Sequence, residues 1–136
     1  MANPRHPRGL IDTSVVIDME QIEPADLPVE IAVSAITMAE LAAGPHATTD
    51  PAERARRQDR LQRAEATFEP LPVDAAVARA YGRVYAAVSA AGRKAHGRRA
   101  VNLFIAATAI AAGLPLYTRN ADDFAGLSEM LDIFAV

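Results

Sequence analysis

The sequence predicts a single α/β domain built around a mostly parallel sheet. Short apolar segments typical of strands alternate along the chain with longer segments whose apolar residues recur at helical spacing. Strands that are joined through helices run parallel, because a right-handed crossover returns the chain to the same end of the sheet. The length of 136 residues suits one domain, and we expect residues 1–136 to form it, with residues 1–7 as a flexible tail.

Five segments are predicted as strands because they are short, apolar and bounded by polar residues, proline or glycine. They are residues 8–11, 31–34, 71–73, 114–118 and 131–134. Asp12 follows the first of them directly, and Asn120 lies just past the fourth. In a parallel sheet these polar residues stand beyond the carboxyl ends of the strands, where such sheets bind ligands.

Five helices are predicted from helical spacing, capping residues and breakers. They are residues 13–19, 37–43, 51–67, the segment from the Asp74 cap to Gly92, and 100–112. Pro51 occupies the first turn of the third helix, which carries opposite charges four residues apart and a narrow apolar stripe. We therefore expect this helix to be peripheral. The last helix is apolar nearly throughout and ends at Gly113, so we expect it to be buried.

The composition excludes several classes of protein. Cysteine is absent, which rules out a disulfide framework or a thiolate zinc site, and we expect a cytoplasmic protein. The N-terminus lacks the apolar run of a signal peptide, and no segment reaches the eighteen or so apolar residues of a membrane span. The net charge of −3 argues against nonspecific nucleic-acid binding driven by charge alone, so RNA or DNA would need a local basic patch or a metal.

Acidic and amide side chains stand where the predicted elements begin or end. Asp12 follows the first strand, Glu40 lies in the first turn of the second helix, and Asn102 begins the long apolar helix. Segment 120–123 follows the fourth strand and contains two aspartates. Carboxylates that converge repel one another and lose hydration, and a divalent cation relieves both costs. Because the candidate ligands all carry oxygen, with no cysteine and no suitably spaced histidine pair, the pattern favours Mg²⁺ or Mn²⁺ over zinc.

Each of these residues also has a purely structural explanation. Asp12 can cap the helix that follows it, and Thr37 with Glu40 has the spacing of a capping box. Asn102 can cap the apolar helix, and the aspartates of segment 120–123 can begin a short helix. Their joint placement at element boundaries, between long segments that must be buried, favours a shared site.

A basic segment directly precedes the apolar helix. Residues 92–99 contain four cations and a histidine, which are Arg93, Lys94, His96, Arg98 and Arg99. Cations near a helix N-terminus oppose the helix macrodipole, so helix stability does not explain them. A phosphate backbone is one partner that fits this segment, and a solvated loop is the other interpretation. Arg119, beside the acidic segment, could also contact phosphate.

Four ordered motifs lie at the positions described above. They are LIDTS at 10–14, SAITMAEL at 34–41, FIAATA at 104–109 and LYTRNADDF at 116–124. With this order and spacing the chain resembles PIN-domain proteins, and most closely the VapC toxins of bacterial toxin–antitoxin pairs. The resemblance covers essentially the whole chain and implies a compact α/β/α sandwich that acts as a Mg²⁺- or Mn²⁺-dependent endoribonuclease. It also implies a homodimer inhibited by a small VapB antitoxin. The basic segment and Arg119 are the predicted RNA contacts.

The resemblance assigns roles residue by residue. Asp12 matches the family's first acid, Glu40 its second, and Asn102 stands where the third acid, an aspartate, is expected. The fourth acid lies in segment 120–123, where we favour Asp122 and leave the next aspartate open. The predicted supporting residues are Thr13, Thr118, Asn120 and Asp123.

Asn102 departs from the pattern of the family. An amide oxygen can coordinate a cation but brings no negative charge. A naturally weakened or specialised enzyme and an engineered inactive one both fit this residue. The leading prediction is a metal-dependent ribonuclease, and the second is a catalytically silent module that binds antitoxin or RNA. A phosphoacceptor domain with Asp12 as nucleophile ranks third, because no carboxylate lies two residues further on and Lys94 is the only lysine.

Overall fold

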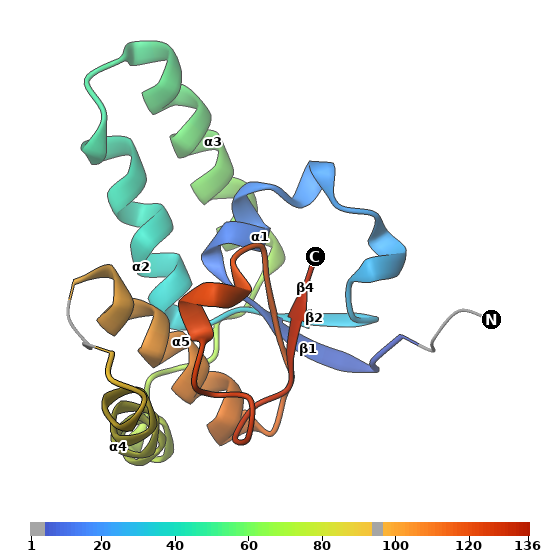
Figure 1. Cartoon of the computed structure of the whole chain (residues 1–136). Coiled ribbons are helices and arrows are strands. Elements are labelled where there is room, and N and C mark those ends of the chain that lie inside the picture. Colours follow the sequence, from blue (N-terminus) through green and yellow to red (C-terminus); the bar gives the residue numbers. More distant parts are fainter. Residues whose placement is uncertain (1–4, 94–96) are drawn as a thin grey trace.

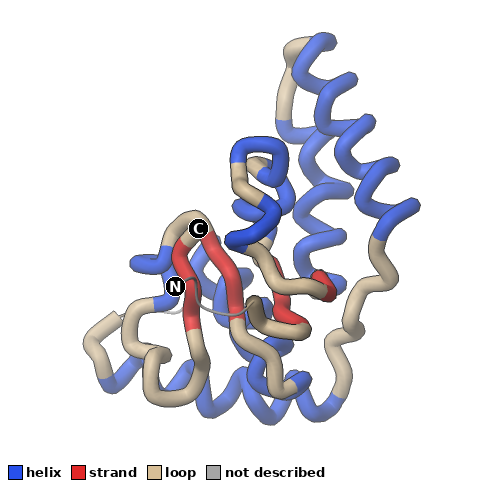
Figure 2. The backbone as a smooth tube through the Cα atoms, turned by 90° about the vertical axis from the view of Figure 1, so that its right-hand side faces the viewer, coloured by secondary structure: helices blue, strands red, loops and turns tan. Residues whose placement is uncertain are grey.

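The computed structural model describes residues 5–93 and 97–136, apart from the side chain of Arg98. Within these residues the chain forms a four-stranded, fully parallel sheet with the order β2-β1-β3-β4. The strands are β1 (Arg8–Ile11), β2 (Glu30–Ala32), β3 (Leu116–Thr118) and β4 (Ile133–Ala135). Helical segments pack on both faces of the sheet, as Figures 1 and 2 show, so the predicted α/β/α sandwich is confirmed.

The two faces of the sheet bury different side chains, because neighbouring residues of a strand point to opposite faces. Leu10 of β1 and Leu116 of β3 lie in one core. The residues that follow them, Ile11 and Tyr117, lie in the other. In the register of the sheet Leu10 pairs with Leu116 and Ile11 with Tyr117, so each core is continuous across the central pair of strands.

The first core is closed by two helices, α4 (Ala75–Ala90) and α5 (Arg98–Ala112). Asp74 caps α4 by accepting a hydrogen bond from the backbone N–H of Val77, which confirms the predicted cap. The buried residues of α4 recur at helical spacing and are Val77, Ala80, Val84 and Val88. α5 ends as predicted at Gly113, whose φ of 68° lies in the left-handed region that glycine adopts readily.

The second core is closed by α1 (Thr13–Ile17) and by two short 3₁₀ turns, η1 (Met19–Gln21) and η2 (Pro24–Asp26). Val15, Ile22 and Leu27 from this region pack against the sheet. Arg5, within the stretch expected to be a flexible tail, donates hydrogen bonds from its guanidinium group to the carbonyl oxygens of Leu27 and Pro28. The first four residues of that stretch lie outside the described part of the chain.

A helical hairpin projects from the domain (Figure 1). It consists of α2 (Ala35–Ala43), the 3₁₀ turn η3 (Gly44–Ala47) and α3 (Pro51–Thr67). Arg57 of α3 donates a hydrogen bond to the carbonyl oxygen of Gly44 and pairs with Glu53 on its own helix. Hydrogen bonds from Arg56 and Arg57 hold the pKa of Glu53 below its ordinary value. Of the residues of α3, all within the described part of the chain, only Ala64 is buried, which confirms that this helix is peripheral.

Several element boundaries differ from the prediction. Residues 71–73 are not a strand, and Leu71 makes a single bridge to Ser34, because the partner segment enters α2 one residue later. α5 begins at Arg98, two residues before its predicted start. No helix in the two described ranges is long and apolar enough to cross a bilayer.

Candidate active site

The strand order creates a switch point between β1 and β3. After β1 the chain passes into α1 on one face of the sheet. After β3 it passes through the 3₁₀ turn η4 (Ala121–Phe124), whose Phe124 packs on the other face. Connections that diverge in this way leave a crevice beyond the carboxyl ends of the two strands, where open α/β sheets bind ligands. Asp12 and the segment from Thr118 to Asp123 lie at this point of the fold.

Asp12 is buried at the switch point, with 5% of its surface exposed. Its Oδ1 accepts a hydrogen bond from the backbone N–H of Val15 at 3.1 Å, so Asp12 caps α1 as its structural explanation predicts. Oδ1 also accepts from the hydroxyl of Ser14 at 2.6 Å. Oδ2 accepts from the hydroxyl of Thr118 at 2.5 Å. Three donors thus satisfy a buried carboxylate, and two of them are not needed for the cap.

Glu40 is linked to the neighbour of Asp12 through a hydroxyl. The hydroxyl of Thr13 donates to Glu40 Oε1 at 2.5 Å. It also lies 3.1 Å from the hydroxyl of Thr37, which must be the donor in that bond because Thr13 has a single hydroxyl proton. Thr13 follows Asp12 directly, so the predicted first and second acids point to the same end of the sheet.

The capping-box explanation for Glu40 is wrong. α2 begins at Ala35, and its cap is Ser34, whose hydroxyl accepts a hydrogen bond from the backbone N–H of Ile36. Glu40 is therefore the sixth residue of the helix, beyond the unpaired N–H groups of the first turn. Helix capping accounts for Ser34 and leaves the carboxylate of Glu40 free for another role.

Asn102 is placed inside α5 rather than at its start. The predicted cap role of Asn102 is wrong, because the helix begins at Arg98 after Gly97, which has a φ of 64°. Asn102 is half-buried, and its amide makes no side-chain hydrogen bond within the described part of the chain. α5 packs against both α2 and η4, the elements that carry Glu40 and Asp122.

The acidic turn after β3 is tied to Asp12 through its backbone. The N–H of Asn120 donates to the hydroxyl of Thr118 at 3.0 Å, and that hydroxyl donates to Asp12. Asp122 is exposed and Asp123 half-buried, and both lie in η4, as the short-helix explanation predicts. Neither carboxylate hydrogen-bonds to another described residue, so the choice between them as fourth acid stays a prediction.

Three of the six predicted RNA contacts have described side chains. Arg93 Nη1 lies 3.5 Å from the carbonyl oxygen of Asp122, which brings the basic segment to the acidic turn. Arg99 Nη1 is buried without an acceptor among the described residues. Arg119 Nε lies 3.4 Å from Asp18 Oδ2. The remaining predictions fall on residues or side chains outside the described part, which are Lys94, His96 and Arg98.

The side-chain oxygens of the three predicted ligands suit a hard cation. Asp12, Glu40 and Asn102 offer carboxylate and amide oxygens, the ligand type that Mg²⁺ and Mn²⁺ prefer. Within residues 5–93 and 97–136 no three Asp, Glu or His side chains lie together as a ready-made metal cluster. Mg²⁺ is commonly held by one or two carboxylates, with water and substrate phosphate in its other positions. Asp12 and Glu40 fit that smaller requirement.

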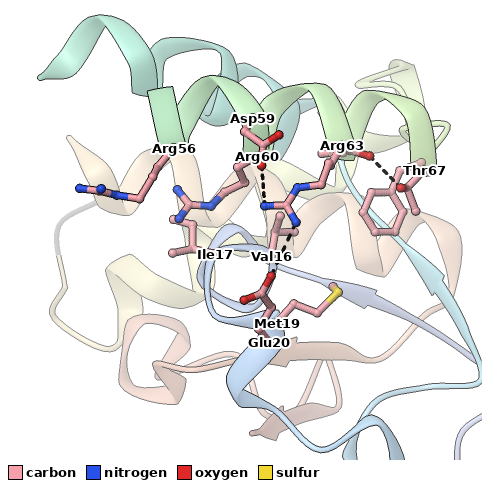
Figure 3. Close-up of a pocket in the computed structure, with 11 residues that line it drawn as sticks. Val16, Ile17, Met19, Glu20, Arg56, Asp59, Arg60, Arg63 and Thr67 are labelled. Carbon is pink, nitrogen blue, oxygen red and sulfur yellow. Dashed lines mark hydrogen bonds and ion pairs between the residues drawn. The ribbon is translucent and has the colours of Figure 1, made fainter. Parts of the chain in front are cut away.

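A groove that the sequence did not indicate runs between α1 and α3 (Figure 3). It encloses about 390 Å³, and Ile17 in its lining is 46% exposed. Its apolar lining consists of Val16, Ile17, Met19, Ala64 and Phe68. Its basic lining consists of Arg56, Arg60 and Arg63. Arg63 pairs with Glu20 and Asp59, whereas Arg60 forms no ion pair with a described residue. The segments that form the groove are about forty residues apart in sequence, so no local motif predicts it.

Comparisons with known proteins agree with this architecture. Residues 10–129 match the family model of the PIN domain. The chain is 38% identical over 122 residues to ribonuclease VapC5 of Mycobacterium tuberculosis, covering 88% of this chain and 87% of that protein. It is 43% identical over 105 residues to ribonuclease VapC8 of the same organism, covering 74% and 89%. A crystal structure of VapBC-5, a toxin–antitoxin system of M. tuberculosis, contains a chain that matches with a TM-score of 0.84 and 36% identity, covering 96% and 99%.

The relatives' matches cover most of both chains, and the family match includes the segments that carry Asp12, Glu40 and Asn102. The chain therefore belongs to the PIN-domain family, and within that family to the VapC group of toxins.

Proposed function

We propose that the chain is the toxin of a type II toxin–antitoxin pair and cleaves RNA by Mg²⁺- or Mn²⁺-assisted hydrolysis of a phosphodiester bond. The observation that carries this proposal is the hydrogen bond from Thr13, the neighbour of the buried Asp12, to the carboxylate of Glu40. The names of the relatives, which are ribonucleases of the VapC group, support it.

The residues of the chain have separable roles in this proposal. A bound divalent ion would activate water and stabilise charge on the phosphate. Asp12, oriented by three hydrogen bonds, would hold the ion together with Glu40, while Asn102 would add a neutral oxygen. Arg93, which lies beside the acidic turn, would attract the phosphate backbone.

A second candidate function is a silent PIN module that binds antitoxin or RNA without cleaving it. The observation that favours it is the amide of Asn102 at the third acidic position, which reduces the negative charge available to a metal. The two functions share a fold and differ in one measurable property, the rate of RNA cleavage.

Cleavage of total cellular RNA in the presence of Mn²⁺ tests both candidates. We expect slow cleavage by the parent protein with Asn102 and at least about tenfold faster cleavage by Asn102→Asp. The double variant Asn102→Asp/Asp12→Asn is the inactive control, because asparagine also caps helices and preserves the start of α1. Cleavage that persists in the double variant would reveal a contaminating nuclease, and no cleavage by any form would favour the silent module.

We also propose that the chain is a homodimer and that a VapB-type antitoxin occupies the groove between α1 and α3. VapBC-5, a solved structure similar to this chain, is a member of the VapBC family of toxin–antitoxin systems, which supports a partner of this kind. The apolar lining and Arg60 would receive an amphipathic segment whose apolar face meets Ile17 and whose acidic side chain meets Arg60. A basic side chain of the same partner would approach the acids at the switch point.

Co-purification with the product of the neighbouring coding region tests the partner proposal, and light scattering of the purified chain tests the dimer. Ile17→Glu should weaken the complex at least about tenfold, because it buries a charge in an apolar contact. Val29→Glu is the matched control, since Val29 is an exposed apolar residue, 64% accessible, that does not line the groove. Equal binding by the two variants would place the partner elsewhere.

A further inference from the structure

Two hydroxyl groups connect the carboxylate of Asp12 to the backbone that follows β3. Ser14 donates to Asp12 Oδ1 at 2.6 Å and accepts from the N–H of Arg119 at 3.0 Å. Thr118 donates to Asp12 Oδ2 at 2.5 Å and accepts from the N–H of Asn120 at 3.0 Å. Each oxygen of one buried carboxylate is therefore joined, through a single hydroxyl, to one of two consecutive peptide groups.

The direction of these bonds is set by chemistry. A backbone N–H can only donate, and a carboxylate can only accept, so each hydroxyl must turn its proton toward Asp12. The turn that carries Asp122 is thereby held in one position relative to Asp12 by bonds that strengthen when Asp12 is ionised. Thr118 belongs to the strand and is fixed by the sheet, whereas Ser14 lies on α1 and joins two separate elements.

The same bonds determine how Asp12 can bind a cation. A carboxylate has about four lone-pair positions. Val15 N–H and Ser14 occupy both positions of Oδ1, and Thr118 occupies one position of Oδ2. The remaining position is on Oδ2, so Asp12 is prepared to bind a cation through that one oxygen.

We propose that Ser14 is a positioning residue that holds Asp12 for one-oxygen coordination and keeps the acidic turn at a fixed distance from it. This inference rests on the metal-dependent function proposed above. Ser14 would touch neither metal nor substrate. Its effect would pass through Asp12 Oδ1 on one side and the Arg119 peptide on the other.

The test compares Ser14→Ala with Ser14→Thr, which retains the hydroxyl. We expect Ser14→Ala to weaken Mn²⁺ binding in calorimetry about tenfold, at the low end of the effect of residues that orient metal ligands. Exchange of the Arg119 amide hydrogen, followed by NMR without metal, should become roughly five- to tenfold faster, as the loss of one hydrogen bond implies. Ser14→Thr should restore both values. Ser89→Ala, which removes an exposed hydroxyl from α4, is the matched control and should change neither.

The two readouts separate this inference from the proposed function. Faster exchange of the Arg119 amide in Ser14→Ala, together with weaker Mn²⁺ binding, would support positioning even if no RNA were cleaved. Unchanged exchange in a folded Ser14→Ala would overturn the link between α1 and the turn. Unchanged Mn²⁺ affinity would overturn the role of Ser14 in presenting Asp12. If Ser14→Ala does not fold, Ser14→Cys replaces it, because a thiol keeps the size but donates only weakly.

Discussion

Replacing Asn102 with aspartate restores the charge that the family pattern expects. At an effective dielectric constant of about 20, two unit charges about 4 Å apart attract by roughly 4 kcal/mol, and a dication doubles this to roughly 8 kcal/mol. Desolvation of the new carboxylate cancels much of the gain. We expect a net gain on the order of 1–3 kcal/mol in Mn²⁺ binding, or about ten- to a hundredfold in affinity.

The structure also sets the expected cost of this substitution in the metal-free protein. Asn102 is half-buried and makes no side-chain hydrogen bond with described residues, so an aspartate there would lack a compensating donor. It is the fifth residue of α5, where the helix dipole no longer favours an acid strongly. Repulsion from Asp12 and Glu40 should therefore leave the metal-free Asn102→Asp variant with an equal or lower melting temperature.

Calorimetric titration measures the gain in Mn²⁺ affinity, and thermal melting with and without metal measures the change in stability. Gln58→Glu is the matched control, because it makes the same amide-to-acid change at an exposed position of α3. It should leave Mn²⁺ affinity unchanged. Equal Mn²⁺ affinity of the parent protein and Asn102→Asp would show that Asn102 is not at the metal site. A higher melting temperature of the metal-free variant would refute the expected repulsion.

Three further predictions concern other parts of the structure. Glu40→Gln should lower the free energy of unfolding by less than about 1 kcal/mol, because an amide oxygen can still accept from Thr13, while Mn²⁺ binding falls in calorimetry. A large loss of stability with unchanged Mn²⁺ affinity would contradict this. Asp74→Ala should cost about 1 kcal/mol in urea unfolding through loss of the α4 cap, and Asp74→Asn should recover most of it. Burial raises the pKa of Tyr117 above its ordinary value of 10.0. The unfolded chain therefore ionises first as pH rises past 10.0. The free energy of unfolding should then fall more steeply with pH in the parent protein than in Tyr117→Phe, and parallel pH profiles would contradict this.

The sequence was sufficient for elements whose signal is local. The charged helix from Pro51, the cap at Asp74 and the stop at Gly113 each depend on residues within one or two turns, and each is present. The start of α2 was misplaced because Ser34 both ends an apolar stretch and caps the next helix. Thr37 then resembled the cap, although its hydroxyl faces Thr13.

Long-range contacts explain what the sequence analysis missed. The gathering of the acids at one end of the sheet could be predicted, because a parallel topology follows from the order of strands and helices alone. The hydrogen bond between Ser14 and Arg119 could not be predicted, because the two residues lie 105 positions apart and the contact involves a peptide group rather than a side chain of Arg119. Residues 71–73 were predicted to form a strand, whereas Leu71 makes only one bridge, to Ser34. The apolar residues around Leu71 do not indicate where the partner segment ends.

The link between Asp12 and Thr118 spans 106 residues, and it has a consequence for the order of events during synthesis. β1 is synthesised before its neighbour β3, and the segment from α1 to α5 is made between them. Until that strand emerges, Asp12 lacks one of its hydroxyl donors and the turn that carries Asp122 does not exist. While the residues between β1 and β3 are being made, a growing chain therefore carries an incomplete site, and a partner present at that stage can meet the toxin before the site is assembled.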